Sequence, residues 1–456
     1  MNILLIQPRM RRRPMDTGLK AKMSPSLALL TIKALTPSCH NVTIMNENIE
    51  EIDYQVTPDL VAITVTVDVL NCAAAIAKRF RHRGIPVVAG GIHITSSPET
   101  ARGLFDSILI GRAEKTWQPM LADLSDGQLK AEYRDAYQDR FIQCPVYTVE
   151  HDTKYLYTNI ISTSRGCPYR CDFCYNSGVN AMPYTNRPME DVLKDIAAIG
   201  RKHILFIDDN FCGNPRWTME FLDKLIPFKI KWSAAVCADV INHPALLDKM
   251  VKSGCQSLFI GFESINPVSL QQVHKNQNHV ADYEKLVDEL HRRGIMINAS
   301  LVFGLPDDDV STFSGTLKWL VKHKIETATA HIMTPYPGTR LYERMQEQKK
   351  IIDYDLSHYD TAHVVFQPDK MTRQQLYNGY IWFYKQFYSF KNIRRRLPDN
   401  RKQRIPYLCF NYLYRKFGCF TEGLTKIVPL SLLGRFAVWL SYDFKRCNYR
   451  NKHKNE

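Results

Sequence analysis

The chain has 456 residues, 45% of them hydrophobic, and a formal charge of +14. That length and apolar content can fill more than one core, which excludes a small domain held together by disulfides and a disordered chain. The positive charge falls entirely on the tail, because residues 373–456 carry 18 Lys and Arg and only four acidic residues. The first apolar run, "ILLI", is too short for a secretion signal, so we expect the protein to stay in the cytoplasm.

The first part of the chain alternates apolar runs with helix-compatible stretches. Buried strands are expected at 2–7, 41–47, 59–67, 85–91 and 107–111. Strands alternating with helices at this spacing predict an α/β fold, with a doubly wound parallel sheet over residues 1–125.

Such sheets bind ligands where the strands end, at the carboxyl edge. The residues at those ends are our candidate ligand contacts: Pro8, Thr64, Thr66, Gly90, Gly91, His93, Gly111 and Glu114. The glycine pair would let a flat, bulky ligand approach the backbone, although a Gly-Gly pair after a strand is equally typical of a turn.

A second alternating series follows a polar segment, residues 126–157, that we interpret as an irregular linker. Strands are expected at 158–163, 203–209, 231–236, 257–263, 296–304 and 327–333. Six strand–helix repeats over 158–345 are two short of a complete barrel and predict a partial (β/α)6 barrel. Its open side would suit a large substrate.

The tail, residues 346–456, is basic, aromatic and expected to be largely helical. The segment 427–446 is apolar over about sixteen residues but is broken by Pro429, Gly434 and Arg435, so it is too short to span a bilayer comfortably. Together with the aromatic segment 380–396, it could lie on a membrane surface or pack on the protein's own core. Both interpretations stay open.

Three cysteines, Cys167, Cys171 and Cys174, lie within eight residues directly after the first strand of the predicted barrel. Structural zinc takes four protein ligands, and no Cys or His pair with zinc-finger spacing follows. An iron–sulfur cube also normally takes four thiolates. Three thiolates would leave one iron open to an external ligand, to which it could pass an electron.

This loop resembles the signature of the radical S-adenosylmethionine (SAM) superfamily, Cys-x3-Cys-x2-Cys with an aromatic residue, here Phe173, before the last cysteine. The resemblance implies a [4Fe–4S] cluster held by the three cysteines. It also implies that the open iron binds the amino and carboxylate groups of SAM, which is cleaved reductively to a 5′-deoxyadenosyl radical. The electron would come from an external donor such as flavodoxin or ferredoxin.

Further stretches resemble SAM-binding segments of that superfamily, namely "FIDDNF", "GFES" and "NASLVFGLP", and "TPYPGTRLY" resembles its sixth-strand signature. The resemblance implies contacts to the methionine part, the ribose and the neighbourhood of the adenine. The candidate residues are Asp208, Asp209, Glu263, Ser264 and Asn298. A carboxylate at a strand end can equally be a helix cap or a salt-bridge partner.

The N-terminal part resembles the cobalamin-binding, flavodoxin-like domain that precedes the barrel in one large branch, and the likeness covers residues 1–345. The chain lacks the Asp-x-His-x-x-Gly motif of cobalamin mutases, so no histidine of that motif would bind the cobalt. His93 is expected in a loop near the ligand. Glu114 stands in the altered stretch "GRAE", where Arg112 replaces an acidic residue of the family.

The two cofactors together imply radical C-methylation of an unactivated carbon, with ring formation or rearrangement as the alternative. The branch includes enzymes that modify hopanoids and tetrapyrroles, which favours a small-molecule or lipid-like substrate and a peripheral contact between the basic tail and the inner membrane surface. Nucleic acid is the disfavoured partner. A transfer-RNA methylthiotransferase is disfavoured because Cys39, Cys72 and Cys144 lie in no motif of that family. A non-catalytic cobalamin sensor would not need the three-thiol loop.

Overall fold

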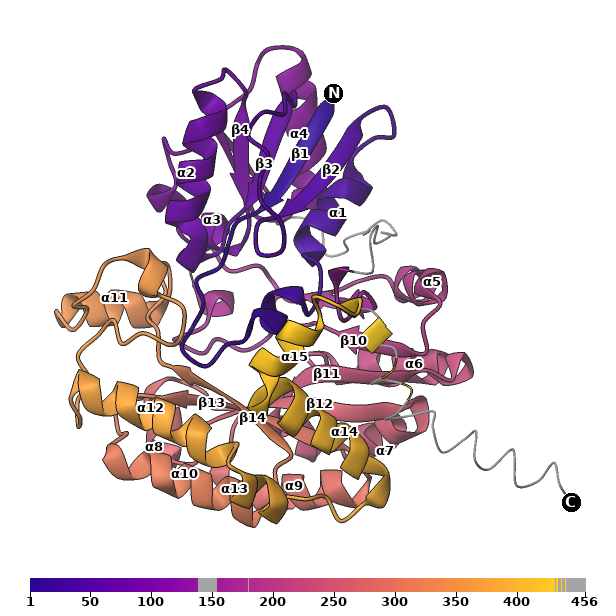
Figure 1. Ribbon diagram of the computed structural model, residues 1–456, viewed down its shortest axis with the longest axis vertical. Coiled ribbons are helices and arrows are strands. Elements are labelled where there is room, and N and C mark those ends of the chain that lie inside the picture. The colour runs from indigo at the N-terminus through magenta and orange to yellow at the C-terminus, as the bar shows by residue number, and fades with distance from the viewer. Residues whose placement is uncertain (138–153, 179, 431, 434–435, 437–438, 440–456) are drawn as a thin grey trace, which may run out of the picture.

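A computed structural model describes residues 1–137, 154–178, 180–430, 432–433, 436 and 439. Figure 1 shows two layered domains, each built on a parallel sheet, with the C-terminal helices lying against the lower one. The fold is therefore α/β, as the alternating apolar runs predict.

The N-terminal sheet has the strand order β2-β1-β3-β4-β5-β6, and all neighbours are parallel. Its strands are β1 (Asn2–Gln7), β2 (Asn41–Asn46), β3 (Leu60–Thr64), β4 (Val87–Gly90), β5 (Ser107–Ile110) and β6 (Glu132–Arg134). The first five follow the flavodoxin order. Alternate residues of each strand point to opposite faces, so this domain has two apolar cores, one on each side of the sheet.

The helices of this domain are α1 (Leu27–Leu35), α2 (Leu70–Arg81), α3 (Ile92–Ser96) and α4 (Ala113–Ser125). Leu4 and Ile6 of β1 face the core that contains α2, whereas Ile3 and Leu5 face the core that contains α1 and α4. The doubly wound arrangement is confirmed.

The segment 126–157 is not irregular throughout, because β6 lies within it and pairs with β5. Its sequence "EYR" has no apolar run to predict a strand, and only Tyr133 is buried. The backbone hydrogen bonds to the existing sheet edge stabilise this strand, although its local sequence has little strand propensity. The domain boundaries at 125, 157 and 345 stay predictions.

The second sheet has the order β14-β13-β12-β11-β10-β7, again parallel throughout. Its strands are β7 (Ile160–Ile161), β10 (His203–Phe206), β11 (Lys231–Cys237), β12 (Cys255–Glu263), β13 (Met296–Phe303) and β14 (Thr327–Ile332). The connecting helices are α5 (Met189–Ile199), α6 (Pro215–Leu225), α7 (Pro244–Ser253), α8 (Pro267–Gln272), α9 (Tyr283–Arg292) and α10 (Val310–Lys322). Six strand–helix units around one core confirm the partial barrel. A small antiparallel ribbon, β8 (Ser164–Arg165) with β9 (Thr185–Asn186), flanks the cysteine loop.

The C-terminal region covers the β14 edge of the barrel. It follows α11 (Arg340–Glu347) and contains α12 (Arg373–Phe387), α13 (Phe390–Arg395), α14 (Arg404–Leu408), a π-helical segment (Cys409–Lys416) and α15 (Gly418–Leu424). The Tyr384 hydroxyl donates to the Ala330 carbonyl at 3.0 Å and accepts from the Ala330 N–H at 2.8 Å. Tyr388 bonds both backbone groups of Ala328 in the same way. These bonds pair N–H and carbonyl groups of the edge strand β14 that would otherwise have no hydrogen-bond partner.

The aromatic segment 380–396 therefore packs mainly on the protein's own core. Tyr380, Phe383 and Phe387 are buried in the barrel core, and the buried guanidinium of Arg396 donates to backbone carbonyls of the barrel. Most of the other tail segment, 427–446, lies outside the described residues. No described helix is both long enough and apolar enough to cross a bilayer.

Candidate active site

The carboxyl ends of the two sheets face each other across a cavity of about 370 Å³. Thr66 and Ile92 line it from the edge of the first sheet, and Tyr175 lines it from the cysteine loop. His331 and Tyr336 line it from the end of β14 and the loop that follows. A ligand in this cavity would touch both domains.

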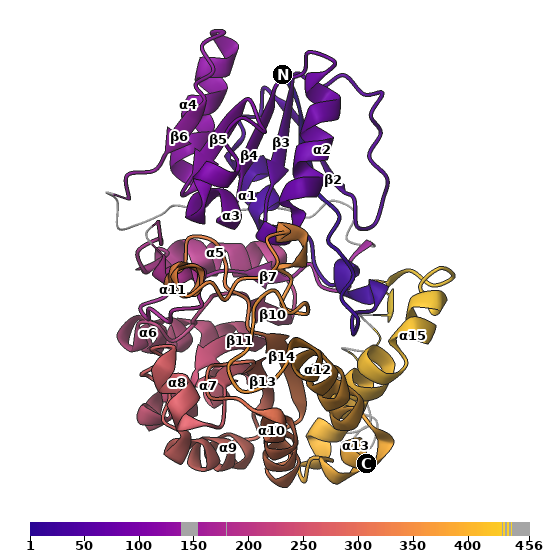
Figure 2. The ribbon, with the colours of Figure 1, turned by 90° about the vertical axis from the view of Figure 1, so that its left-hand side faces the viewer.

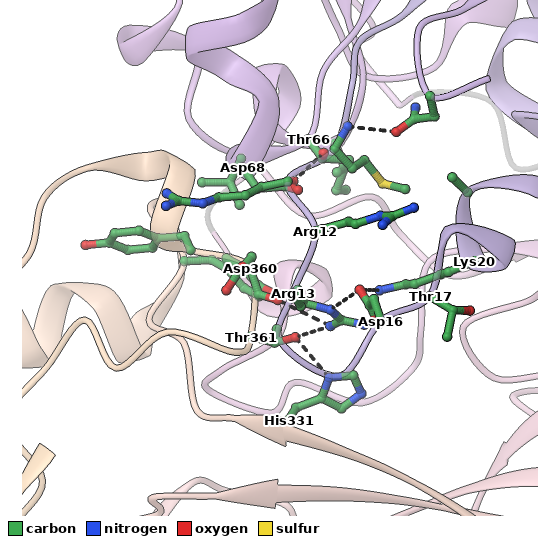
Figure 3. A pocket seen from close by; sticks show the side chains of 18 of the residues that line it. Arg12, Arg13, Asp16, Thr17, Lys20, Thr66, Asp68, His331, Asp360 and Thr361 are labelled. Carbon is green, nitrogen blue, oxygen red and sulfur yellow. Dashed lines mark hydrogen bonds and ion pairs between the residues drawn. The ribbon is translucent and has the colours of Figure 1, made fainter. Parts of the chain in front are cut away.

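The segment between β1 and α1, residues 8–23, lines one side of this cavity; we call it the strap. Arg13 on the strap donates to the Thr361 hydroxyl at 2.7 Å and pairs with Asp16 at 2.9 Å. His331 bonds the same hydroxyl at 3.0 Å, and Figure 3 shows these side chains converging. Burial lowers the pKa of His331 to about 3, so its ring is neutral at physiological pH. The positive charge here comes from Arg13 and from Lys20, which pairs with Asp16 at 2.8 Å.

The strap is fixed to the C-terminal region at the rim of the cavity. Glu422 of α15 accepts from the Gly18 N–H at 2.9 Å and pairs with Arg12 at 2.7 Å. Arg12 and Gly18 both line the cavity. Helix α15 therefore lies beside the cavity, and Figure 2 shows it projecting from the barrel next to the strap.

The cysteine loop is held at several points by its own residues and by the barrel. The Ser177 hydroxyl is within 2.6 Å of the Cys171 carbonyl and 2.7 Å of the Cys174 carbonyl, so it closes the loop at its end. The buried Asp172 carboxylate accepts from Arg344 of α11 at 2.6 Å. Gly166 has φ +71°, and a Cβ there would lie 2.7 Å from the Met182 carbonyl oxygen. The loop conformation thus needs glycine at this position.

The three thiols suit an iron–sulfur cluster in chemistry and placement. Burial raises the pKa of Cys167 to about 11 and that of Cys174 to about 12, and the neighbouring Cys171 thiol raises both further. Within the described ranges, no three His, Cys, Asp or Glu side chains converge on one point as ligands of a single ion would. Since each thiolate of a cube binds a different iron, three neighbouring thiols on one loop fit a cluster. Phe173, which stands between Cys171 and Cys174 in the sequence, packs against the barrel core.

Asp208 supports the start of the cysteine loop. Its Oδ1 accepts from the N–H groups of Thr163 and Ser164, at 2.8 and 2.6 Å, and from both hydroxyls, at 3.1 and 2.6 Å. The carboxylate is buried, and that burial raises its pKa. Oδ1 is therefore engaged by the chain itself, which the likeness to a SAM contact did not reveal, whereas Oδ2 is buried and has no hydrogen-bond partner among the described residues.

Asp209 lies nearer the thiols. It is an electrostatic neighbour of Cys167 and Cys174 and raises the pKa of both. Partial desolvation raises the pKa of Asp209 itself. Asp209 thus lies close to two of the thiols, and the roles of Asp208 and Asp209 toward a ligand stay predictions.

Glu263 is the buried partner of a lysine that the sequence did not single out. Its Oε1 lies 2.5 Å from Lys275 Nζ, and its Oε2 accepts from the Ser300 hydroxyl at 3.2 Å. Glu263 has φ +60°, a left-handed conformation that is costly for a residue other than glycine and is typical of functional sites. Ser264 accepts from the Asn266 N–H at 3.0 Å. Asn298 accepts from the Thr329 hydroxyl at 3.4 Å.

At the edge of the first sheet, only Thr66 of the predicted contacts lines the cavity. Gly91 has φ +119°, and a Cβ there would lie 2.7 Å from the Val65 carbonyl oxygen, so it makes room for its own chain. A Cβ on Gly90 would make ordinary contact with Leu109, and one on Gly111 would lie 2.8 Å from Asp135. Gly91 and Gly111 therefore have packing reasons to be glycine, whereas Gly90 has room for a Cβ; the crowding at Gly91 favours the turn interpretation of the pair. Thr64 contacts the Gly91 position, and the Pro8 carbonyl accepts from Asn48.

His93 and Glu114 also differ from expectation. His93 lies inside α3, not in a loop; it is fully buried, bonds Thr100 at 2.9 Å, and burial lowers its pKa to about 4. Glu114 pairs with Arg165, just before the first cluster cysteine, at 3.4 Å. The "GRAE" stretch thus links the first domain to the cysteine loop. Its Arg112 pairs with Asp135 at the end of β6, which explains the basic residue there.

Sequence reasoning missed Tyr175 and Tyr336. Their rings stack with centroids 4.5 Å apart. The Tyr175 hydroxyl is buried, and within the described part of the chain it has no hydrogen-bond partner. Tyr175 directly follows Cys174, and Tyr336 lies in "TPYPGTRLY". Their positions in or next to these two motifs could have identified both residues. They lie between the thiols and the cavity.

Residues 161–320 match the family model of the Radical SAM superfamily. The chain therefore carries a radical SAM domain over these residues, which indicates an enzyme and implies a [4Fe–4S] cluster and SAM as cofactors. The residues matched include the cysteine loop and strands β10 to β13.

Over its length the chain is similar to bacteriochlorophyllide d C-12(1)-methyltransferase of Chlorobaculum tepidum, with 27% identity covering 91% of this chain and 92% of that one. It is also similar to the hopanoid C-2 methylase of Rhodopseudomonas palustris, with 23% identity covering 74% and 67%. Among solved structures it resembles the radical SAM methyltransferase TsrM of Kitasatospora setae with cobalamin and a [4Fe–4S] cluster bound. The TM-score is 0.65 and the identity 15%, with 96% of this chain and 99% of that one covered. This likeness shows the same two-domain fold.

Proposed function

We propose that the chain is a cobalamin-dependent radical SAM enzyme that methylates an unactivated carbon of a lipid-like or other apolar substrate. The observation that carries the proposal is the cavity between the cysteine loop and the edge of the flavodoxin-like sheet. A corrin above and a SAM-bound cluster below would meet there. Both relatives named above are methylating enzymes, which supports the reaction type.

Each part of the chain has a defined task in this proposal. Cys167, Cys171 and Cys174 would hold the cluster, and Asp209 would bind the SAM ammonium. Thr66 and the strands' carboxyl ends would contact the corrin. When bound, these cofactors supply a 5′-deoxyadenosyl radical and a methyl group.

The remaining side chains orient the substrate and limit the access of water. Tyr175 offers its unpaired hydroxyl to a polar group of the substrate or corrin, and the Tyr175–Tyr336 pair presents an apolar wall. The strap closes one side, with Arg13 fixed by Asp16 and Thr361. A flavodoxin or ferredoxin would deliver the electron to the cluster.

Mass spectrometry of small molecules and lipids tests the reaction class. Cells with and without the protein would be supplied with methionine labelled on its methyl group. We expect a compound heavier by one CH2 unit that carries the label. A changed compound without added carbon would contradict methylation and support the alternative, ring formation or rearrangement; no changed compound would count against both.

We also propose that α15 contacts an anionic membrane surface. Phe420 and Ile427 are 76% and 82% exposed, and Lys416 and Lys426 flank them. Exposed aromatic and aliphatic side chains next to lysines favour the interface of an anionic bilayer, where each cation contributes about 1 kcal/mol. An apolar substrate could then reach the cavity rim from the lipid.

Co-sedimentation with phosphatidylglycerol vesicles measures this contact. We expect the Phe420→Ser/Ile427→Ser variant to bind vesicles at least about threefold less than the wild type, from lost apolar burial. The control is Val251→Ser, which removes from α7, away from α15, an apolar side chain that is 40% exposed. Equal partitioning of all three proteins would remove the membrane proposal.

A further inference from the structure

A short loop after α8, residues 273–278, lies against the cysteine loop. The Asp172 N–H donates to the Val273 carbonyl at 3.1 Å. The Gln277 side-chain amide donates to Cys171 Sγ at 3.4 Å. Lys275 Nζ lies 5.9 Å from the centre of the Phe173 ring. Three side chains of this loop therefore reach the cysteine loop: Lys275 brings a cation, Gln277 an N–H donor to sulfur, and the His274 ring bonds the Asp172 carboxylate at 2.9 Å.

This loop is fixed to the end of β12. The buried Asn278 amide donates to the Gly261 carbonyl at 2.7 Å and to the Phe262 carbonyl at 3.1 Å. The Tyr283 hydroxyl donates to the same Phe262 carbonyl at 2.9 Å. The Lys275 N–H donates to the Leu270 carbonyl at 3.0 Å. Lys275 and Gln277 are thus held in place by the barrel and do not depend on surface contacts.

Lys275 is a buried cation, with only 5% of its surface exposed. Burial opposes its charge, but Glu263 and the thiols of Cys237 and Cys171 outweigh this and raise the pKa of Lys275. Lys275 in turn lowers the pKa of Cys167. Since its Nζ lies 5.9 Å from the Phe173 ring, Lys275 places its positive charge beside the cysteine loop.

We propose that Lys275 and Gln277 set the reduction potential of the cluster. The proposal rests on the cluster of the proposed function. Accepting one electron from a flavodoxin or ferredoxin makes the cluster more negative by one charge. A nearby cation and an N–H···S bond both stabilise that reduced form more than the oxidised form, so both raise the potential. Lys275 and Gln277 act through the cluster and are positioning residues.

Potentiometric titration, followed by electron paramagnetic resonance of the reconstituted cluster without SAM, cobalamin or substrate, tests this inference. We expect lower midpoint potentials in Lys275→Met and Gln277→Leu, and a larger decrease in the double variant. At the wild-type midpoint, the ratio of reduced to oxidised cluster should fall about tenfold in the double variant, which is about 59 mV for one electron. Lys275→Arg keeps the charge and should stay near the wild type.

Gln272→Leu and Lys252→Met are matched controls, since both side chains are exposed and lie outside this loop. Should Lys275→Met fail to assemble a cluster because it leaves Glu263 unpaired, Gln277→Leu still tests the inference without changing any charge. Gln277→Glu, which places a carboxylate near the sulfur, should lower the potential further. An unchanged midpoint in Gln277→Leu and Gln277→Glu at full iron content would overturn the inference. A wild type that assembles no cluster would instead overturn the proposed function.

Discussion

Replacing Cys171 with Ala should abolish the formation of 5′-deoxyadenosine. Cys171 is the middle of the three thiols, and two remaining thiolates cannot hold a cube that already lacks a fourth protein ligand. Iron content should fall from about four atoms per chain to near background. Hydroxocobalamin affinity should stay within about twofold of the wild type, because the edge of the first sheet lies apart from this side chain.

The control for this variant is Cys39→Ala, which removes an exposed thiol far along the chain from the cysteine loop. It should keep full iron content and full deoxyadenosine formation. If Cys171→Ala still turned over SAM, the assignment of the cluster to this loop would be wrong.

Replacing Gly338 with Ala should separate the two domains at the cavity. Gly338 has φ +82°, and a Cβ there would lie 2.2 Å from the Ser96 carbonyl oxygen of the first domain. On its other side, the Gly338 carbonyl lies where a Cβ on Gly178 of the cysteine loop would come within 2.2 Å. Three segments thus meet with no room for a methyl group. We expect hydroxocobalamin affinity to fall at least about tenfold, since tenfold is only about 1.4 kcal/mol.

Gly103→Ala is the control that distinguishes the effect of this close contact from the effect of backbone strain. Gly103 has φ +79°, nearly the same, but a Cβ there would meet nothing within 4 Å. It carries the same left-handed cost, about 1–2 kcal/mol, without the collision. Isothermal titration of both variants with hydroxocobalamin measures the difference, and equal affinities would show that the close contact is unimportant.

The strands and the cysteine loop could be predicted from the sequence because local pattern determines them. Apolar runs such as 2–7 and 203–209 are typical of strands buried in a parallel sheet. Their alternation with helix-compatible stretches was therefore enough to predict the two sheets. The strand β6 could not be predicted, since its residues pair only because β5 already offers an edge. The composition of the β6 segment alone therefore does not predict that it pairs with β5.

The roles of the strand-end carboxylates could not be predicted, because their partners come from distant parts of the chain. Asp208 is engaged by Thr163 and Ser164, and Glu263 by Lys275. A motif identifies an acidic residue that could bind a ligand. It does not show whether a hydrogen-bond donor of the protein itself already occupies that carboxylate. The aromatic tail was ambiguous for a related reason: Tyr384 and Tyr388 look equally suited to a membrane until β14 is known to present a bare edge beside them.

Glu422 joins the last described helix to the beginning of the chain, 404 residues away from Gly18. During synthesis, nearly the whole polypeptide must leave the ribosome before this contact can form. Until then the strap lacks this contact, so the rim of the cavity takes its final form only after α15 has been synthesised.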